Sequence, residues 1–156
     1  MAHEIERKYL LKNDDWRKKV KAQKHYHQGY LNTIETCSVR VRIEGEQAKI
    51  NVKSAEYGIS RDEYEYDIPM DDAKKMLATL CVGPTLEKTR YFVEQNDLIW
   101  EIDEFSGDNE GLIVAEVELN SETQTFEKPT WLGEEVTEDT RYYNVNLIKQ
   151  PYKDWD

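Results

Sequence analysis

The chain is dominated by short segments in which charged and apolar residues alternate. Such runs lie at about residues 3–11, 26–33, 37–44, 47–54, 59–69, 85–94, 97–105 and 113–120. Successive side chains of a β-strand point to opposite faces, so each run predicts a strand with one charged and one apolar face. The links between the second and fifth runs are short, and Gly45-Glu46 is typical of a tight turn, which favours an antiparallel meander.

Four segments with helical character are expected between or after these strands. The clearest runs from Asp71 to Leu80, where apolar residues recur at the i, i+3, i+4 and i+7 spacing of an amphipathic helix. The others are Asp14 to Ala22, a short helix that begins at the capping box Ser121–Gln124 and ends by Pro129, and Thr137 to Lys149. Their apolar sides need a surface to pack on, which the apolar faces of the strands supply.

These elements predict a β-rich α+β fold. A single strand with one charged face is more often an ordinary solvated strand, but about eight such strands with intervening helices favour a closed antiparallel eight-stranded β-barrel with helices packed outside. The charged faces then line the lumen of a tunnel, which in an eight-stranded barrel admits only side chains or one small ligand. A length of 156 residues is expected to form one domain over 1–156.

The lumen of such a barrel would bring carboxylates and cations together, because buried charges require partners. Carboxylates hold hard divalent cations, and lysine or arginine holds anions rich in oxygen. A polyphosphate carrying Mg²⁺ or Mn²⁺ uses both, since the metal bridges phosphate and carboxylate oxygens. The inward positions are Glu4, Glu6, Glu63, Glu65, Glu101, Asp103, Glu116 and Glu118, with Lys8, Arg40, Arg42, Lys53, Lys88 and Arg90.

Composition narrows the classes of partner. The 32 acidic and 21 basic residues give a net charge of −11, which argues against a nucleic-acid duplex or an anionic membrane as partner.

Cys37 and Cys81 have no zinc-ligand spacing, so free thiols are expected, and a histidine metal site at His25 and His27 is disfavoured against hard oxygen ligands. Without an apolar leader or spanning run, a soluble, cytoplasmic protein is expected. No P-loop or Ser/His/Asp elbow is present.

Glu4-Ile5-Glu6-Arg7-Lys8 resembles the ExExK signature of the CYTH superfamily, the triphosphate tunnel metalloenzymes. The stretches Gln28–Leu31 and Arg141–Asn144 look like those of its small bacterial-type members, which hydrolyse inorganic triphosphate. The resemblance covers nearly the whole chain, and its other motifs are Arg40-Val41-Arg42, Val52-Lys53-Ser54, Glu63-Tyr64-Glu65, Glu87–Tyr91, Glu101-Ile102-Asp103, Glu116-Val117-Glu118 and Gly133–Asp139.

The resemblance implies roles for individual residues. The leading metal ligands are Glu4, Glu6, Glu116 and Glu118, with Glu63, Glu65 and Asp103 as further metal or water-positioning groups. The triphosphate would be gripped by Lys8, Arg40, Arg42, Lys53, Lys88 and Arg90. Two metal sites are expected, one that orients the phosphates and one that activates a water for attack on a terminal phosphorus.

Tyr30 has two interpretations. Gln28 and Tyr30 share a strand face, and the resemblance places Tyr30 in the tunnel near Lys8. Because an ammonium group favours a neighbouring phenolate, Lys8 and Tyr30 would form a proton-handling pair with an alkaline rate optimum. The other interpretation is that Tyr30 simply fills the barrel wall.

Hydrolysis of inorganic triphosphate to pyrophosphate and phosphate is the expected function. Thiamine triphosphate hydrolysis and ATP cyclisation by a class IV adenylyl cyclase remain alternatives, because the fold does not choose the substrate. A polyphosphate-binding module without turnover and a β-rich interaction protein are alternatives outside the enzyme class. The four tryptophans are expected in the core or a lid rather than in a base-stacking platform, and a homodimer is one option for the oligomeric state.

Overall fold

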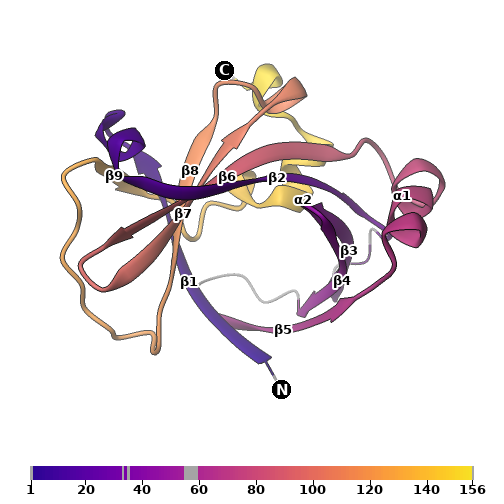
Figure 1. Ribbon diagram of the computed structural model, residues 1–156, viewed down its shortest axis with the longest axis horizontal. Coiled ribbons are helices and arrows are strands. Elements are labelled where there is room, and N and C mark those ends of the chain that lie inside the picture. The colour runs from indigo at the N-terminus through magenta and orange to yellow at the C-terminus, as the bar shows by residue number, and fades with distance from the viewer. Residues whose placement is uncertain (1, 33, 35, 55–59, 156) are drawn as a thin grey trace.

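The protein is described here by a computed structural model that covers residues 2–32, 34, 36–54 and 60–155. One antiparallel sheet curls into a closed eight-stranded barrel with the strand order β5-β4-β3-β2-β6-β7-β8-β1, closed by pairing of β1 with β5 (Figure 1). The strands are β1 (Ala2–Leu11), β2 (Val20–Tyr30), β3 (Cys37–Glu44), β4 (Gln47–Ser54), β5 (Ser60–Asp67), β6 (Leu86–Gln95), β7 (Leu98–Phe105), β8 (Ile113–Glu118) and β9 (Leu132–Glu135).

Strand β1 joins the barrel on two edges. On one edge it pairs with β8, from Glu6 opposite Glu118 to Leu10 opposite Val114. On the other edge its first half pairs with β5 and its second half with β9. Because the side chains of directly paired residues lie on the same face, this register carries the charged positions of β1 into the lumen beside those of β5 and β8.

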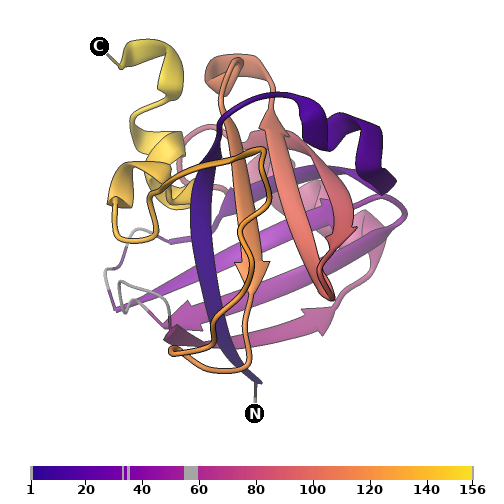
Figure 2. The same cartoon turned by 90° about the vertical axis from the view of Figure 1, so that its left-hand side faces the viewer.

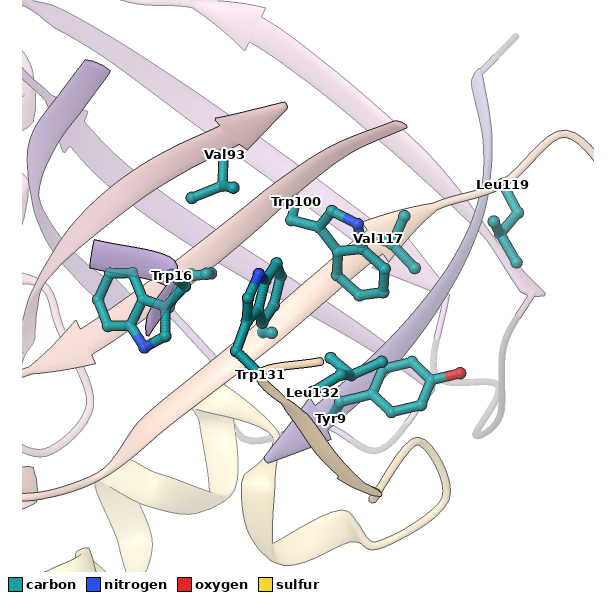
Figure 3. Packing of buried hydrophobic residues seen from close by; sticks show 10 residues of the cluster. Tyr9, Trp16, Val93, Trp100, Val117, Leu119, Trp131 and Leu132 are labelled. Carbon is teal, nitrogen blue, oxygen red and sulfur yellow. The ribbon is translucent and has the colours of Figure 1, made fainter. Parts of the chain in front are cut away.

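The main apolar core lies outside the barrel wall. Trp100 and Val117, neighbours of inward carboxylates in sequence, point outward and pack with Tyr9, Trp131 and Trp16 (Figure 3). The Trp100 ring centroid lies 5.5 Å from that of Trp131 and 5.9 Å from that of Tyr9, both in edge-on geometry. Trp16, Trp100 and Trp131 are fully buried, so they serve the core, as expected.

Helix α1 (Met70–Thr79) confirms the helix expected at 71–80. Its buried residues Ala73 and Leu77 pack against Val41 of β3 and Ala48 of β4 on the outside of the barrel. The chain after the helix approaches β2 so closely that a Cβ at Gly29 would lie 2.5 Å from the Cys81 sulfur. Among the described residues, no helix is both long and apolar enough to cross a membrane.

The first expected helix is wrong. Residues 14–22 form only a 3₁₀ turn at Asp15–Lys19, and β2 already begins at Val20, where the expected strand began near residue 26. Pairing of β2 with β6, from Val20 opposite Val93 onward, outweighs the weak helical pattern in this segment. Thr33 and Ile59, included in two expected strands, lie outside the described residues.

The helix expected between Ser121 and Pro129 is also wrong. The segment makes one turn, in which the Gln124 side chain accepts a hydrogen bond from the Asn120 amide at 2.6 Å, and then runs extended along the outside of the barrel (Figure 2). The Phe126 ring packs 5.7 Å from that of Trp100, and this contact favours the extended path over a helix. The segment ends in β9, a strand that the sequence pattern did not predict.

The last expected helix is shorter than residues 137–149. A 3₁₀ turn at Thr140–Tyr142 precedes helix α2 (Asn144–Lys149). Asp139 accepts a hydrogen bond from the Arg141 amide at the start of the turn. Leu147 of α2 is fully buried in a second apolar cluster with Leu86 and Val114, which fixes the C-terminal segment against the barrel.

Candidate active site

The lumen contains a cavity of about 180 Å³. It has room for several waters or one small ligand. Its lining confirms the expected charged lumen, with seven carboxylates and six cationic groups from seven strands. They are Glu4, Glu6, Lys8, Arg40, Arg42, Lys53, Arg61, Glu63, Glu65, Arg90, Glu101, Glu116 and Glu118. Tyr30, Ser38 and the segment Tyr143–Val145 also line it.

Four of the carboxylates, Glu4, Glu6, Glu63 and Glu118, form an acidic group where β1 meets β5 and β8. Glu6 lies directly opposite Glu118 in the sheet. Burial raises the pKa of Glu118, and the charges of Glu4, Glu6 and Glu63 raise it further. Like charges are therefore concentrated at this place in the lumen, which is the electrostatic setting that a divalent cation relieves.

Two cations already bind this acidic group. Lys53 Nζ lies 3.1 Å from Glu4 Oε1 and 3.6 Å from Glu63 Oε2. Arg61 Nε lies 3.4 Å from Glu4 Oε1, and Arg61 Nη2 lies 3.5 Å from Glu6 Oε1. Burial and Glu4 raise the pKa of Glu6, but the charges of Lys53, Lys8 and Arg61 outweigh them and hold it below its usual value.

The donor chemistry of the acidic group fits Mg²⁺ or Mn²⁺, since both ions prefer carboxylate oxygens. Among the described residues, no three acidic, histidine or cysteine side chains converge on a finished metal site. The oxygens of Glu4 and Glu6 are instead engaged by ammonium and guanidinium groups. Glu4 and Glu6 could therefore bind a hard cation once Lys53 and Arg61 move away from their oxygens.

A second cluster surrounds Arg90. Its Nε lies 2.7 Å from Asp103 Oδ1, its Nη2 lies 3.2 Å from Glu116 Oε1, and its Nη1 lies 3.3 Å from Glu101 Oε2. Although burial opposes the charge, Asp103 and Glu101 raise the pKa of Arg90 well above its ordinary value. The guanidinium stays charged, and the three carboxylates hold it in a fixed orientation at the cavity wall.

Lys88 and Asp103 lie behind this cluster rather than in the cavity lining. Lys88 Nζ donates to Asp103 Oδ2 at 2.7 Å, and the two side chains are 1% and 2% exposed. Burial and the nearby Arg90 charge lower the pKa of Lys88 to about 8, against the opposing effect of Asp103. Among the expected site residues these two are the ones that the structure does not bring to the cavity surface, and they hold Arg90 from behind.

A third cluster joins β3, β4 and β5. Arg42 Nη2 donates to Glu65 Oε2 at 2.9 Å and to Glu44 Oε1 at 3.0 Å. Asn51 links Glu65 to Glu63, donating at 3.1 Å and 2.7 Å. The Nε groups of Arg40 and Arg42 are buried without a hydrogen-bond partner within the described part of the chain, and both side chains line the cavity.

Lys8 contacts the C-terminal segment. Its ammonium group donates to the Tyr142 carbonyl at 3.4 Å and lies 5.1 Å from the centre of the Tyr143 ring. Tyr30 is buried in the cavity wall, and in the described structure no hydrogen bond joins its hydroxyl to Lys8. Burial lowers the pKa of the nearby Arg61 guanidinium. Glu6 and Glu4, with a smaller contribution from Tyr30, raise this pKa by more than burial lowers it.

Sequence reasoning missed Arg61 and the wall formed by Tyr143 and Asn144. Arg61 stands two residues before Glu63, so the alternation that revealed Glu63 and Glu65 also carried the signal for Arg61. Tyr143 and Asn144 had no such signal, because they reach the lumen from a short turn and helix far along the chain.

His25, His27 and both cysteines lie apart from the cavity lining. His25 contacts Glu87 at 3.1 Å and His27 contacts Thr85 at 2.8 Å, both by way of Nε2. Cys37 and Cys81 are free thiols, as expected.

The fold and the site together define a class of protein: a closed antiparallel barrel whose lumen pairs carboxylates with arginine and lysine around one small cavity. The chain belongs to the CYTH domain family, whose model matches residues 2–152. It is 45% identical over 155 residues to an inorganic triphosphatase of Acetivibrio thermocellus, covering 99% of both chains. It is 42% identical over 124 residues to an inorganic triphosphatase of Nitrosomonas europaea, covering 77% of this chain and 81% of the relative.

A solved structure agrees with these relatives. The crystal structure of the inorganic triphosphatase NE1496 superimposes with a TM-score of 0.68 at 36% identity and covers 95% of each chain. The expected tunnel fold is thereby confirmed.

Proposed function

We propose that this protein hydrolyses inorganic triphosphate to pyrophosphate and orthophosphate with Mg²⁺ or Mn²⁺. The observation that carries the proposal is the small lumen cavity in which carboxylates for a hard cation face arginines and lysines for an oxygen-rich anion. The names of the two relatives and of the matching crystal structure support the same activity. A nucleic-acid duplex and a membrane surface are not proposed as partners, given the net charge of −11.

The cationic groups of the lining would bind the phosphate chain. Arginine forks give oriented, bidentate contacts to phosphate oxygens, while ammonium groups neutralise charge. Lys88 would act through Asp103, which fixes the Arg90 guanidinium. The proposed phosphate-binding residues are Lys8, Arg40, Arg42, Lys53 and Arg90, with Lys88 in support.

The acidic group would hold the divalent cation. Glu4, Glu6, Glu116 and Glu118 are proposed as the leading ligands, and Glu63, Glu65 and Asp103 as groups that orient ligands or water. When bound, the cation supplies charge neutralisation at the phosphate oxygens and lowers the pKa of water.

Tyr30 and Lys8 are proposed to manage the proton of the attacking water. Both residues line the cavity. The expected consequence is a rate that rises toward alkaline pH. A Tyr30→Phe variant that kept the same pH profile would show instead that Tyr30 only fills the wall.

The first test is release of orthophosphate from inorganic triphosphate, with ATP and thiamine triphosphate in parallel, from pH 7 to 10 with Mg²⁺, Mn²⁺ or EDTA. Turnover of triphosphate that EDTA abolishes is expected. Preferential formation of cyclic AMP or thiamine diphosphate would assign one of the alternative reactions. No turnover, combined with a triphosphate-induced rise in melting temperature, would assign a binding module.

Substitutions at two of the proposed metal ligands test their assignment. Glu4→Gln and Glu118→Gln are expected to lower kcat at least about a hundredfold, because each removes a charged oxygen ligand at similar size. Glu46→Gln, in the exposed turn between β3 and β4, is expected to behave like the unsubstituted protein. Metal-dependent turnover that survives either site substitution would refute the ligand assignment.

We also propose a cytoplasmic location and leave a homodimer as a hypothesis, which sedimentation of the purified protein would test.

A further inference from the structure

Arg61 lies where the barrel closes. Its Cα pairs with that of Glu4 in the β1–β5 register, so its side chain enters the lumen beside the acidic group. The side chain is 20% exposed and lies against the Tyr143 ring, 5.6 Å from guanidinium carbon to ring centre. It therefore has cavity solvent on one side and an aromatic wall on another.

The guanidinium spans two proposed metal ligands at once. Its Nε faces Glu4 at 3.4 Å and its Nη2 faces Glu6 at 3.5 Å. Lys53 also contacts Glu4, but its other carboxylate partner is Glu63. Distances near 3.5 Å are long for charge-assisted hydrogen bonds, which are usually 2.7–2.9 Å, so the two Arg61 contacts are loose and readily exchanged.

A divalent cation at Glu4 and Glu6 would need the same carboxylate oxygens that Arg61 now contacts. We propose that Arg61 is a displaceable counter-ion of the metal-binding carboxylates and that it couples the binding of the divalent cation to the binding of triphosphate. This inference rests on the proposed function, because it names the order in which the same cavity fills.

The coupling follows from where the guanidinium can go. Without an anion, a cation that binds Glu4 and Glu6 leaves Arg61 in a crowded positive lumen with Lys8 and Lys53. With triphosphate present, the guanidinium transfers to phosphate oxygens, which match its planar fork. The cation then binds more easily, and by linkage triphosphate binds more easily in the presence of the cation.

A structural role makes the opposite prediction. If Arg61 only fastened β1 to β5, its removal would loosen the site and weaken binding of every ligand. If it competes for the carboxylates, its removal strengthens binding of the cation alone and weakens the cooperation with triphosphate.

The test measures free Mn²⁺ by electron paramagnetic resonance, with the full-length chain and no turnover. The ligands are Mn²⁺ alone and Mn²⁺ with the imido-linked analogue of triphosphate, whose P–N–P bridges resist hydrolysis. Arg61→Gln is expected to bind Mn²⁺ alone about tenfold more tightly than the unsubstituted protein, and the analogue should raise that affinity by a smaller factor than it does in the unsubstituted protein. Arg17→Gln is the control, because Arg17 pairs with Glu104 outside the cavity lining.

Arg61→Lys keeps the test decisive if Arg61→Gln fails to fold. A lysine retains the charge but cannot span Glu4 and Glu6, so a smaller rise in Mn²⁺ affinity, about threefold, is expected. Unchanged or weaker Mn²⁺ binding in the folded variants would overturn the inference. Failure of the proposed function is distinguishable, because it would appear as absent phosphate release from triphosphate by the unsubstituted protein, whatever the Mn²⁺ result.

Discussion

Asp103 is the residue on which the buried charges of the lumen wall depend. It accepts hydrogen bonds from Lys88 and Arg90, all within 2.9 Å, and it is 2% exposed. Burial raises the pKa of Asp103, but Arg90 and Lys88 lower it by more, so it remains ionised. One carboxylate thus orients two cations, one of which faces the cavity.

Asp103→Asn is expected to lower the free energy of unfolding by about 3–5 kcal/mol, because it removes the carboxylate that pairs with buried Lys88 and the nearest of the three carboxylates around Arg90. Urea denaturation at pH 7 measures this loss. Asp108→Asn, at an exposed pair with Lys153, is the matched control and should change stability by less than about 1 kcal/mol. A similar small effect for both variants would contradict the structural role of Asp103.

The raised pKa of Tyr26 makes the stability of the fold depend on pH in the alkaline range. Burial, aided by Glu44 and Glu101, raises its pKa to about 12 from a reference value of 10.0. Above pH 10 the unfolded chain loses this proton while the folded protein retains it, so stability falls as pH rises from about 10 to 12. The neutral hydroxyl also donates to Glu44 at 3.2 Å, which requires the proton.

Tyr26→Phe should therefore unfold with a shallower dependence on pH between 10 and 12. Thermal melts at intervals across that window test this expectation. An equal slope in both proteins would mean that Tyr26 ionises as easily in the folded state as in the unfolded one.

At the scale of elements, α1 stabilises the barrel from outside. Leu77 is buried against β3 and β4, whereas Leu80 beyond the helix is 58% exposed. Leu77→Ala is expected to cost about 2–3 kcal/mol through lost burial and a residual cavity, while Leu80→Ala should stay within about 0.5 kcal/mol. Urea midpoints of the two variants measure the difference, and equal midpoints would show that α1 does not support the wall.

The strands were predictable because their alternation is local and repeated. Arg40 and Arg42, or Glu116 and Glu118, reveal an inward face from a few residues, and the register of β1 with β8 then follows from the barrel. The 121–129 segment and β9 were not predictable in this way. Their conformation depends on Phe126 meeting Trp100 and on β9 pairing with β1, contacts between positions far apart in the chain.

At the scale of the whole molecule, an acidic chain encloses a cavity that six cationic side chains line. The barrel sorts charge by face, so the net charge of −11 describes the chain and not its lumen. The carboxylates beside those cations keep the cavity close to neutral, so an anion would be met by cations locally rather than by the charge of the whole chain.

Filling this cavity should stabilise the barrel as a unit, because the lining comes from strands all around it. With Mg²⁺ and the imido-linked triphosphate analogue at about 100 times their dissociation constants, the gain is about 2.7 kcal/mol. That corresponds to a rise in melting temperature of roughly 5–10 °C, which differential scanning calorimetry measures. EDTA should remove most of the rise, and a rise unaffected by EDTA would mean that the anion binds without the metal.

The sequence by itself determined the charged and apolar faces of the strands, and through them the barrel, its family and most of the lining residues. Those features follow from spacing along the chain, which a strand converts directly into faces. Only the tertiary structure decided which charges pair: that Lys88 and Asp103 lie behind Arg90, that Arg61 spans Glu4 and Glu6, and that Tyr143 closes against Lys8. These pairings depend on burial and on distances between strands far apart in sequence, which no local pattern specifies.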